Sequence, residues 1–187
     1  NGNCEIIIAN KTGRAIRFPE DKVRPMGRNA AGVRGITLDK SNDQVIGMVC
    51  VDPLIDKGAS FLVVSEHGNG KRSDLEDYRV TNRGGKGVKT IKVTDKTGKL
   101  VSIKKVFDED DLMITTTNGV TIRMNIDQLR VMGRATSGVR LIRLDDGDAI
   151  ADVTVVKKDD TIDETIEIIP VEPENPTEGI AEPFEEE

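Results

Sequence analysis

The clearest copy of a repeated eleven-residue phrase reads Arg83-Gly84-Gly85-Lys86-Gly87-Val88-Lys89-Thr90-Ile91-Lys92-Val93. The other two copies are RNAAGVRGITL at 28–38 and RATSGVRLIRL at 134–144. Each phrase has an arginine, three small or polar residues, a glycine, a valine and a basic residue, and then continues with alternating apolar positions. Such a stretch predicts a loop that leads into a β-strand. Three copies in one register indicate an internal repeat.

The repeat extends beyond the phrase on its N-terminal side. Matching positions are separated by 55 and then 51 residues, which divides the chain into units at about 4–58, 59–109 and 110–158. A turn glycine opens the shared part of each unit, at Gly13, Gly68 and Gly119. Basic residues then recur in four series: Arg17, Arg72 and Arg123; Arg24, Arg79 and Arg130; Arg28, Arg83 and Arg134; and Arg34, Lys89 and Arg140.

Each unit is predicted to form about four short antiparallel strands. They are an apolar run, the strand that carries the first arginine, the phrase, and a second apolar run. The first runs are 6–8, 61–64 and 112–114, and the last are 45–51, 100–106 and 150–156. Strands at this spacing with turns between them predict an all-β fold of propeller-like blades. We therefore expect residues 1–158 to be a three-blade domain that forms an open arc.

Charge is distributed unevenly along the chain. The whole sequence has 27 Lys and Arg, 33 Asp and Glu, and a net charge of −6. Residues 159–187 contain twelve acidic residues and no basic ones, which leaves residues 1–158 with 27 basic and 21 acidic side chains. This asymmetry predicts a body that binds a polyanion, followed by an acidic tail. We expect the tail to be disordered, although 161–171 could add one strand.

Other features of the composition limit the setting in which the protein works. Cys4 and Cys50 are the only cysteines, which fits a reduced, cytoplasmic protein, and we expect both thiols to be buried. No apolar run approaches 18 residues, so no membrane span is expected. The chain begins at Asn1, close to a predicted strand, so we expect it to be a piece of a longer polypeptide.

No group of residues predicts catalysis. The single histidine, His67, falls at a predicted turn, and Tyr78 takes the position of Val23 and Leu129, which predicts a core residue. The acidic cluster at 145–148 lacks the spacing of a calcium loop, and the glycine loop lacks the Ser or Thr of a phosphate-binding P-loop. We predict no catalytic site, metal or cofactor in this chain.

The recurring basic residues predict contacts with a nucleic-acid backbone. The same positions in successive blades would form an arc of positive charge, which holds phosphates without reading bases. We expect the series of Arg24, Arg79 and Arg130 to pair instead with the acidic residues three positions earlier, Asp21, Glu76 and Asp127. The predicted DNA-binding residues are Arg17, Arg28, Arg34, Arg72, Arg83, Lys86, Lys89, Arg123, Arg134 and Arg140.

The sequence at 81–87, TNRGGKG, is similar to the gyrase A box, Q-(R/K)-R-G-G-(R/K)-G, and departs from it at Thr81 and Asn82. The three units resemble blades of the β-pinwheel, the C-terminal domain of the DNA gyrase A protein. The family has its intact box in the first blade, whereas this copy lies in the middle unit. The resemblance therefore indicates the last three of six blades followed by the acidic tail.

The resemblance implies a function in which double-stranded DNA is bent around a basic rim without sequence specificity. This wrapping would support negative supercoiling by an ATP-dependent type II topoisomerase, whose catalytic tyrosine, ATP and Mg²⁺ lie outside this chain. Its implied partners are the N-terminal region of gyrase A and the gyrase B protein, in an A2B2 holoenzyme.

Two alternative functions remain open at this point. One is the corresponding C-terminal domain of topoisomerase IV. The other is a propeller-like module that binds an acidic protein, with its basic residues on one top face. Because three blades do not close a ring of about six, we also expect the chain either to self-associate through its ends or to form an open arc with a frayed first unit.

Overall fold

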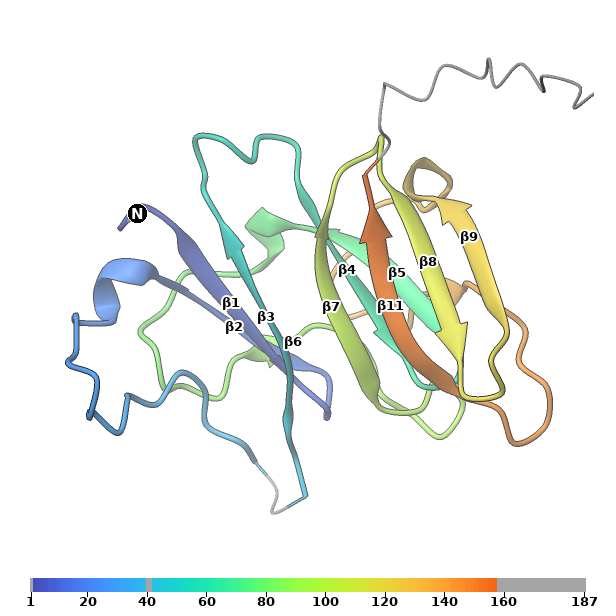
Figure 1. Ribbon diagram of the computed structural model, residues 1–187, viewed down its shortest axis with the longest axis horizontal. Coiled ribbons are helices and arrows are strands. Elements are labelled where there is room, and N and C mark those ends of the chain that lie inside the picture. Colours follow the sequence, from blue (N-terminus) through green and yellow to red (C-terminus); the bar gives the residue numbers. More distant parts are fainter. Residues whose placement is uncertain (1, 40–41, 158–187) are drawn as a thin grey trace, which may run out of the picture.

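The computed structural model describes residues 2–39 and 42–157. Within these ranges the chain forms eleven strands and three short 3-10 helices, with no α-helix (Figure 1). No helix in this part is long and apolar enough to cross a membrane. The acidic tail and the possible strand at 161–171 lie outside the described residues. The fold is all-β, as predicted.

The strands follow the order that the repeat predicts. Neighbouring strands in every sheet are antiparallel, and the last strand of each unit has the predicted bounds. Unit one has β1 (Glu5–Asn10), β2 (Arg14–Pro19), the 3-10 helix η1 (Glu20–Lys22) and β3 (Val45–Val51). Unit two has β4 (Ser60–Ser65), β5 (Asn69–Asp74), η2 (Leu75–Asp77), β6 (Val88–Lys89) and β7 (Leu100–Val106). Unit three has β8 (Asp111–Thr116), β9 (Thr121–Asn125), η3 (Ile126–Gln128), β10 (Val139–Arg140) and β11 (Ile150–Val156).

The phrase joins the sheet of the preceding unit, whereas we expected it to pair within its own unit. The sheets have the orders β3-β1-β2-β6, β10-β5-β4-β7 and β11-β8-β9. Thus unit two supplies the fourth strand of the first sheet, and unit three supplies that of the second. The phrase at 28–38 forms no strand among the described residues. Consecutive units are therefore linked by hydrogen-bonded strands as well as by packing.

Close backbone approach explains why glycine precedes the paired part of the phrase. Gly87 has a φ of +72°, and a Cβ at this position would lie 2.4 Å from the carbonyl oxygen of Ala15 in β2. Gly138 has the same relation to the carbonyl oxygen of Gly70, also at 2.4 Å. Only glycine combines this left-handed conformation with so short an approach. The phrase thus lies directly against the preceding unit.

Two of the three apolar clusters lie between the units, and the third, around Ile16, Phe18 and Ile36, lies within unit one. In β4, Phe61 and Val63 join the cluster shared with unit one, while the alternate residues Leu62 and Val64 join the cluster shared with unit three. Both faces of β4 are covered, which explains its uninterrupted apolar sequence. Tyr78 is fully buried, as predicted, and meets the Phe61 ring edge-on at a centroid distance of 5.4 Å.

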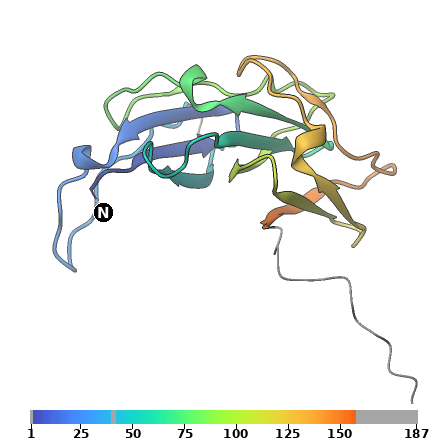
Figure 2. The same cartoon turned by 90° about the horizontal axis from the view of Figure 1, so that it is seen from above.

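The three sheets follow one another along an arc (Figure 2). Strands β3, β7 and β11 lie on its concave side, and β7 contacts both of the others. The phrase loops of units two and three run along the convex side, whereas the loop that leads into the first phrase extends from the unit-one end of the arc (Figure 2). This arrangement has the form of the predicted open arc of blades.

The prediction of buried thiols is wrong for Cys50. Neither cysteine forms a disulfide, Cys50 is exposed and Cys4 is half-buried. Cys50 and Met48 alternate along β3 with the buried Val49 and Val51, so they lie on the open face of an edge strand.

Candidate nucleic-acid interface

The buried side chain of Arg17 links unit one to unit two by hydrogen bonds. Its Nη1 donates to the carbonyl oxygens of Leu75 (2.8 Å) and Tyr78 (3.0 Å), which begin and follow the 3-10 helix η2. Its Nε donates to Glu5 Oε2 at 2.8 Å, and the side chain is only 7% exposed. A buried guanidinium must have its charge and its donors satisfied, and these partners do so.

Arg72 repeats this arrangement at the second junction. Its Nη1 donates to the carbonyl oxygens of Ile126 (3.1 Å) and Leu129 (3.2 Å), which match Leu75 and Tyr78. Its Nε bonds Ser60 Oγ at 3.0 Å, and Nη2 pairs with Asp108.

The prediction that Arg17 and Arg72 contact DNA is therefore wrong. Both guanidinium groups are buried and engaged within the protein, where they fix the following unit. Arg123, the third member of the series, remains a candidate because its side chain is 56% exposed, although it pairs with Asp111.

The phrase arginines connect successive phrases. Arg83 donates from Nε to the carbonyl oxygen of Lys22 (2.9 Å) and from Nη1 to that of Arg34 (3.1 Å). Arg134 donates from Nη1 to the carbonyl oxygen of Lys89 at 3.0 Å, and Lys89 matches Arg34 in the repeat. Arg83 and Arg134 thus fix the backbone at the basic position of the preceding phrase, and the side chains at that position, Arg34 and Lys89, are exposed.

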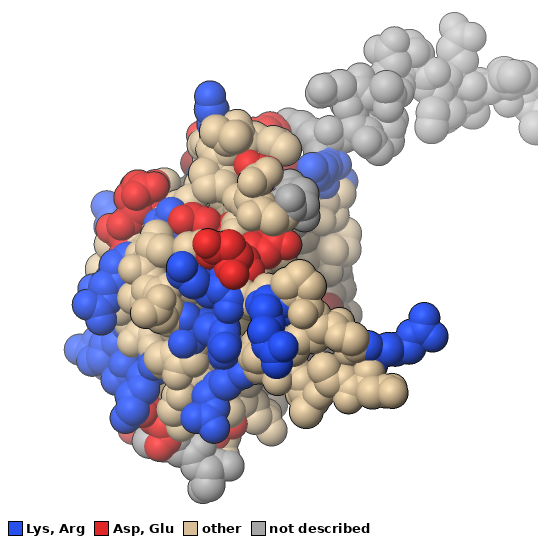
Figure 3. All heavy atoms as spheres, turned by 90° about the vertical axis from the view of Figure 1, so that its left-hand side faces the viewer, with Lys and Arg blue, Asp and Glu red and all other residues tan. Residues whose placement is uncertain are grey.

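Exposed basic side chains occur in the phrases, in one further series and at scattered positions elsewhere. Within the phrases they are Arg28, Arg34, Lys86, Lys89, Lys92, Arg140 and Arg143. The further series is Arg24, Arg79 and Arg130, which is exposed as well. Figure 3 shows Lys and Arg gathered at the unit-one end of the molecule, beside a smaller group of Asp and Glu.

The expected pairing of Arg24, Arg79 and Arg130 with acidic neighbours is wrong. No ion pair joins any of them to Asp21, Glu76 or Asp127 in the part of the chain that the structure describes. Instead, Glu76 Oε1 lies 4.0 Å from Arg17 Nη2, and Asp21 Oδ2 lies 3.8 Å from Lys22 Nζ. The sequence reasoning thus left out three exposed basic residues. Their recurrence at the same position in all three units was the signal available in the sequence.

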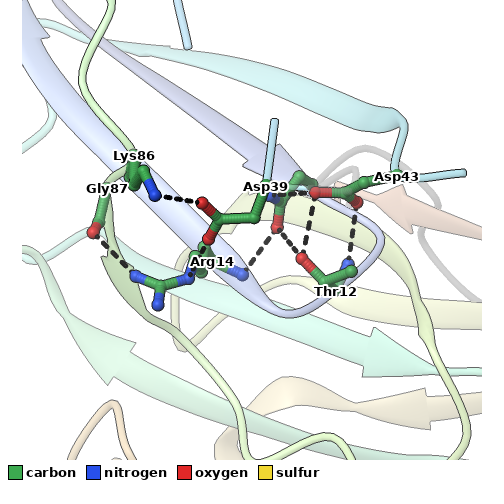
Figure 4. Close-up of polar contacts among 7 residues, drawn as sticks. Thr12, Arg14, Asp39, Asp43, Lys86 and Gly87 are labelled. Atoms are coloured by element: carbon green, nitrogen blue, oxygen red, sulfur yellow. Dashed lines mark hydrogen bonds and ion pairs between the residues drawn. The ribbon is translucent and has the colours of Figure 1, made fainter. Parts of the chain in front are cut away.

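A charged group occurs at the first junction that the second junction lacks. Asp39, just after the first phrase, accepts Lys86 Nζ on Oδ1 (2.8 Å) and Arg14 Nε on Oδ2 (3.1 Å) (Figure 4). Arg14 also donates from Nη1 to the carbonyl oxygen of Gly87 at 3.3 Å. The positions that match Arg14, Asp39 and Lys86 at the second junction are Asn69, Thr94 and Ser137, all uncharged.

His67 and the acidic cluster at 145–148 line the same cleft. His67 is exposed at the turn between β4 and β5, beside a cleft of about 640 Å³. In the same cleft, Asp148 accepts bonds from Thr117 Oγ1 (2.7 Å) and the Asn118 amide (3.1 Å). The Thr117 bond is the main cause that lowers the pKa of Asp148 to about 2. No group of three or more His, Cys, Asp or Glu among the residues described here could hold a metal ion.

The repeated antiparallel sheets, the strand exchange between units and the basic outer edge define a propeller-like repeat domain. The sequence model of the DNA gyrase C-terminal domain, beta-propeller, matches residues 5–52, 59–106 and 110–157. The chain belongs to this family of DNA gyrase C-terminal domains.

Individual relatives agree with this assignment. The chain is 46% identical over 160 residues to the DNA gyrase A protein of Staphylococcus aureus strain NCTC 8325 / PS 47, and the strain N315 protein gives the same values. The match covers 85% of this chain and 18% of each relative, so the chain spans about a fifth of their length.

Solved structures share the fold. A DNA gyrase A C-terminal domain matches with a TM-score of 0.73 and 25% identity, over 82% of this chain and 51% of that one. A DNA topoisomerase IV C-terminal domain gives a TM-score of 0.76 and 21% identity, over 83% of this chain and 47% of that one.

Proposed function

We propose that this chain binds the backbone of duplex DNA along its outer edge and bends it, as part of a type II topoisomerase of the gyrase kind. The observation that carries the proposal is the placement of the exposed basic residues. Arg34, Lys89 and Arg140 are exposed and take the same position in successive phrases, and the phrase loops of units two and three lie on the convex side of an arc (Figure 2). A curved row of cations suits a bent polyanion.

The chemistry of this edge favours contact with phosphates over base recognition. Its basic side chains stand on loops and two-residue strands, and no helix among the described residues could enter a major groove. Smoothly bending 20–30 bp by 40–90° costs about 1–6 kcal/mol, so several contacts are needed to offset it. The row of exposed residues offers that number of contacts.

The wider setting is part of the same proposal. The chain would work in a cytoplasmic enzyme with the rest of gyrase A and with gyrase B, where ATP and Mg²⁺ are used elsewhere. Family membership and 46% identity to a DNA gyrase A protein favour gyrase over topoisomerase IV. The similarity to the topoisomerase IV domain supports the shared fold.

A salt titration of DNA binding tests the proposal. Two 30-bp duplexes of unrelated sequence are labelled, and binding is followed by fluorescence anisotropy over a range of salt concentrations. We expect similar affinities for both, and a log–log slope of roughly −3 to −5, since each phosphate contact contributes about −0.9. Binding that ignores salt, or that strongly prefers one sequence, contradicts the proposal.

A pair of double variants locates the binding surface. Arg34→Gln with Lys89→Gln should weaken binding and reduce the slope, while the carbonyls that Arg83 and Arg134 hold are retained. The control is Lys57→Gln with Lys157→Gln, which removes the same charge from exposed positions outside the phrases. Equal loss in both variants would indicate a general charge effect and exclude the outer edge as the specific surface.

A further inference from the structure

The Asp39 carboxylate holds two cations, one on each oxygen. Lys86 reaches Oδ1 at 2.8 Å and Arg14 reaches Oδ2 at 3.1 Å, from opposite sides of the junction (Figure 4). A phosphodiester also presents two unesterified oxygens, and Arg and Lys are the residues that hold them in nucleic-acid complexes. The pair of donors would therefore suit a backbone phosphate as well as it suits the carboxylate.

This group of charges remains accessible from solvent. The side chains of Lys86, Arg14 and Asp39 are 67%, 34% and 23% exposed. A cleft of about 250 Å³ opens beside Lys86 and is lined also by Arg79 and the backbone of Gly85. A phosphate that approaches the outer edge can thus reach Lys86 without any rearrangement of the core.

The junction does not need Asp39 to hold together. The end of the first phrase is already bonded to the second by main-chain groups: the Thr37 amide donates to the Gly85 carbonyl (2.9 Å), and the Gly84 amide donates to the Gly35 carbonyl (2.6 Å). The second junction has the matching bond between the Lys92 amide and the Thr136 carbonyl (3.0 Å), but no matching charged group. The ion pairs of Asp39 are therefore an addition to a shared framework.

Asp43, four residues later, shows what a structural carboxylate looks like in the same loop. It is buried and accepts bonds from neutral donors, among them Asn10 Nδ2 (2.7 Å), the Thr12 amide (3.1 Å) and Thr12 Oγ1 (3.0 Å) (Figure 4). Asp43 fixes the β1–β2 turn. Asp39, in contrast, is partly exposed and neutralises two residues of a basic surface.

We propose that Arg14 and Lys86 form a phosphate-binding site of the DNA-contacting edge, and that Asp39 occupies this site until the DNA backbone displaces it. The inference rests on the proposed function and adds Arg14 to the contact residues. Displacement breaks the two ion pairs of Asp39 and forms two with the phosphate. Asp39 therefore lowers the affinity of this edge and reduces its dependence on salt.

The variant Asp39→Asn tests the site, because it removes the competing charge and keeps the shape of the side chain. With both cations free, binding of a 30-bp duplex should release about one more counterion per contact. We expect roughly five- to tenfold tighter binding at about 0.1 M salt, and a log–log slope steeper by about 0.9 or more. Adding Lys86→Gln should remove most of this gain.

The matched control is Asp145→Asn, at the position of unit three that matches Asp39. Asp145 makes no ion pair with any residue that the structure describes. Its removal lowers the charge of the chain equally, and affinity should change less than about twofold. A similar gain in DNA affinity in both variants would overturn the inference. A gain that persists when Lys86→Gln is added to Asp39→Asn would overturn it as well.

Two further outcomes separate this inference from the proposed function. Salt-dependent binding by the unaltered chain, with Asp39→Asn equal or weaker, overturns the inference alone and assigns Asp39 to positioning the two cations. Absence of salt-dependent duplex binding by the unaltered chain overturns both. Urea unfolding of Asp39→Asn should match that of the unaltered chain, which confirms that the change in affinity does not come from altered folding.

Discussion

The two junctions between consecutive units share one backbone arrangement and differ in their side-chain chemistry. In both, a buried arginine holds two carbonyl oxygens of the next unit, and a glycine brings the next phrase against the second strand. The first junction adds the charges of Arg14, Asp39 and Lys86. The second has a fully buried Lys71 where the first has Ile16.

The difference teaches that the assembly of the units and the charge of the outer surface rest on separate residues. The shared contacts use backbone carbonyls, which are present whatever the side chains are, so they can be repeated along the arc. The features that differ are side-chain charges, which need no counterpart in the next unit. A repeat of this kind can vary its outer surface from unit to unit without losing its junctions.

The largest loss of stability is expected on replacing the buried arginines. Its size should differ between the two junctions. Arg17→Met leaves the half-buried Glu5 without its cation, and we expect the free energy of unfolding to fall by about 3–5 kcal/mol. Arg72→Met removes the two matching bonds to carbonyl oxygens at the second junction, but its acidic partner Asp108 is 76% exposed and can be hydrated. That variant should lose less, about 1–3 kcal/mol.

Urea unfolding measures both losses. The only tyrosine, Tyr78, is buried at the first junction and the chain has no Trp, so tyrosine fluorescence reports on this junction directly. Adding Glu5→Gln to Arg17→Met should recover part of the stability. Equal losses for Arg17→Met and Arg72→Met would show that the carbonyl bonds, shared by both junctions, account for the whole effect.

The phrase glycines should affect both junctions alike and by a somewhat smaller amount. Gly87→Ala and Gly138→Ala each bring a Cβ to within 2.4 Å of a backbone oxygen, in addition to the strain of a positive φ. Together these cost roughly 2–4 kcal/mol.

Gly32 is the natural control for the glycine variants. It has a φ of +82° but no atom within 4 Å of an added Cβ, so Gly32→Ala should cost only about 1–2 kcal/mol. Thermal or urea unfolding of the three variants gives the comparison. If Gly32→Ala is as harmful as Gly87→Ala, the close approach at the junction is not what requires glycine.

The smallest effect, when taken for each unit of pH, is expected from a pH dependence of stability at the second junction. Lys71 is fully buried, its Nζ donates to the Gly133 carbonyl at 2.6 Å, and burial lowers its pKa from 10.5 to about 8. Asp77, which raises this pKa, and Arg134, which lowers it, are the nearby charges. Between about pH 8 and 10.5 the unfolded chain therefore binds more protons at this site, so Lys71 makes stability rise with pH.

Lys71→Met isolates this contribution. The Gly133 carbonyl keeps bonds from the Thr136 amide (3.2 Å) and Thr136 Oγ1 (3.0 Å), so no acceptor loses its last partner. In the unaltered chain, the free energy of unfolding should rise by at most about 1.4 kcal/mol per pH unit. We expect this rise to be absent in the variant. Unfolding measured from pH 7.5 to 10.5 tests this. An equal rise in both proteins would mean that Lys71 remains charged in the folded state.

The sequence predicted the strands well and their partners poorly. The bounds of β3, β7 and β11 follow from apolar runs that end at turns, because local alternation and turn residues set where a strand begins and ends. The same alternation does not say which strand edge the phrase will join. Val88 has an identical local pattern whether it pairs within unit two or with Ala15 of unit one.

The buried arginines show the same limit at the site. Arg17 and Arg72 recur as regularly as Arg34 and Lys89, so recurrence alone predicted DNA contact for all of them. What separates them is burial, which depends on the neighbouring unit: the carbonyls of Leu75 and Tyr78 reach Arg17 only after unit two has packed. Arg79 was misjudged for the complementary reason, since an acidic residue three positions earlier does not ensure an ion pair.

The sequence by itself determined the repeat, the all-β character, the turn glycines and the family, because these depend on residue order and short-range sterics. Only the tertiary structure decided which basic residues face solvent, which hold the next unit together, and that Asp39 meets Arg14 and Lys86. Those properties join residues about 25 to 60 positions apart through the exchange of strands between units. Burial and charge pairing are set by spatial neighbours, and here the decisive neighbours belong to the adjacent repeat.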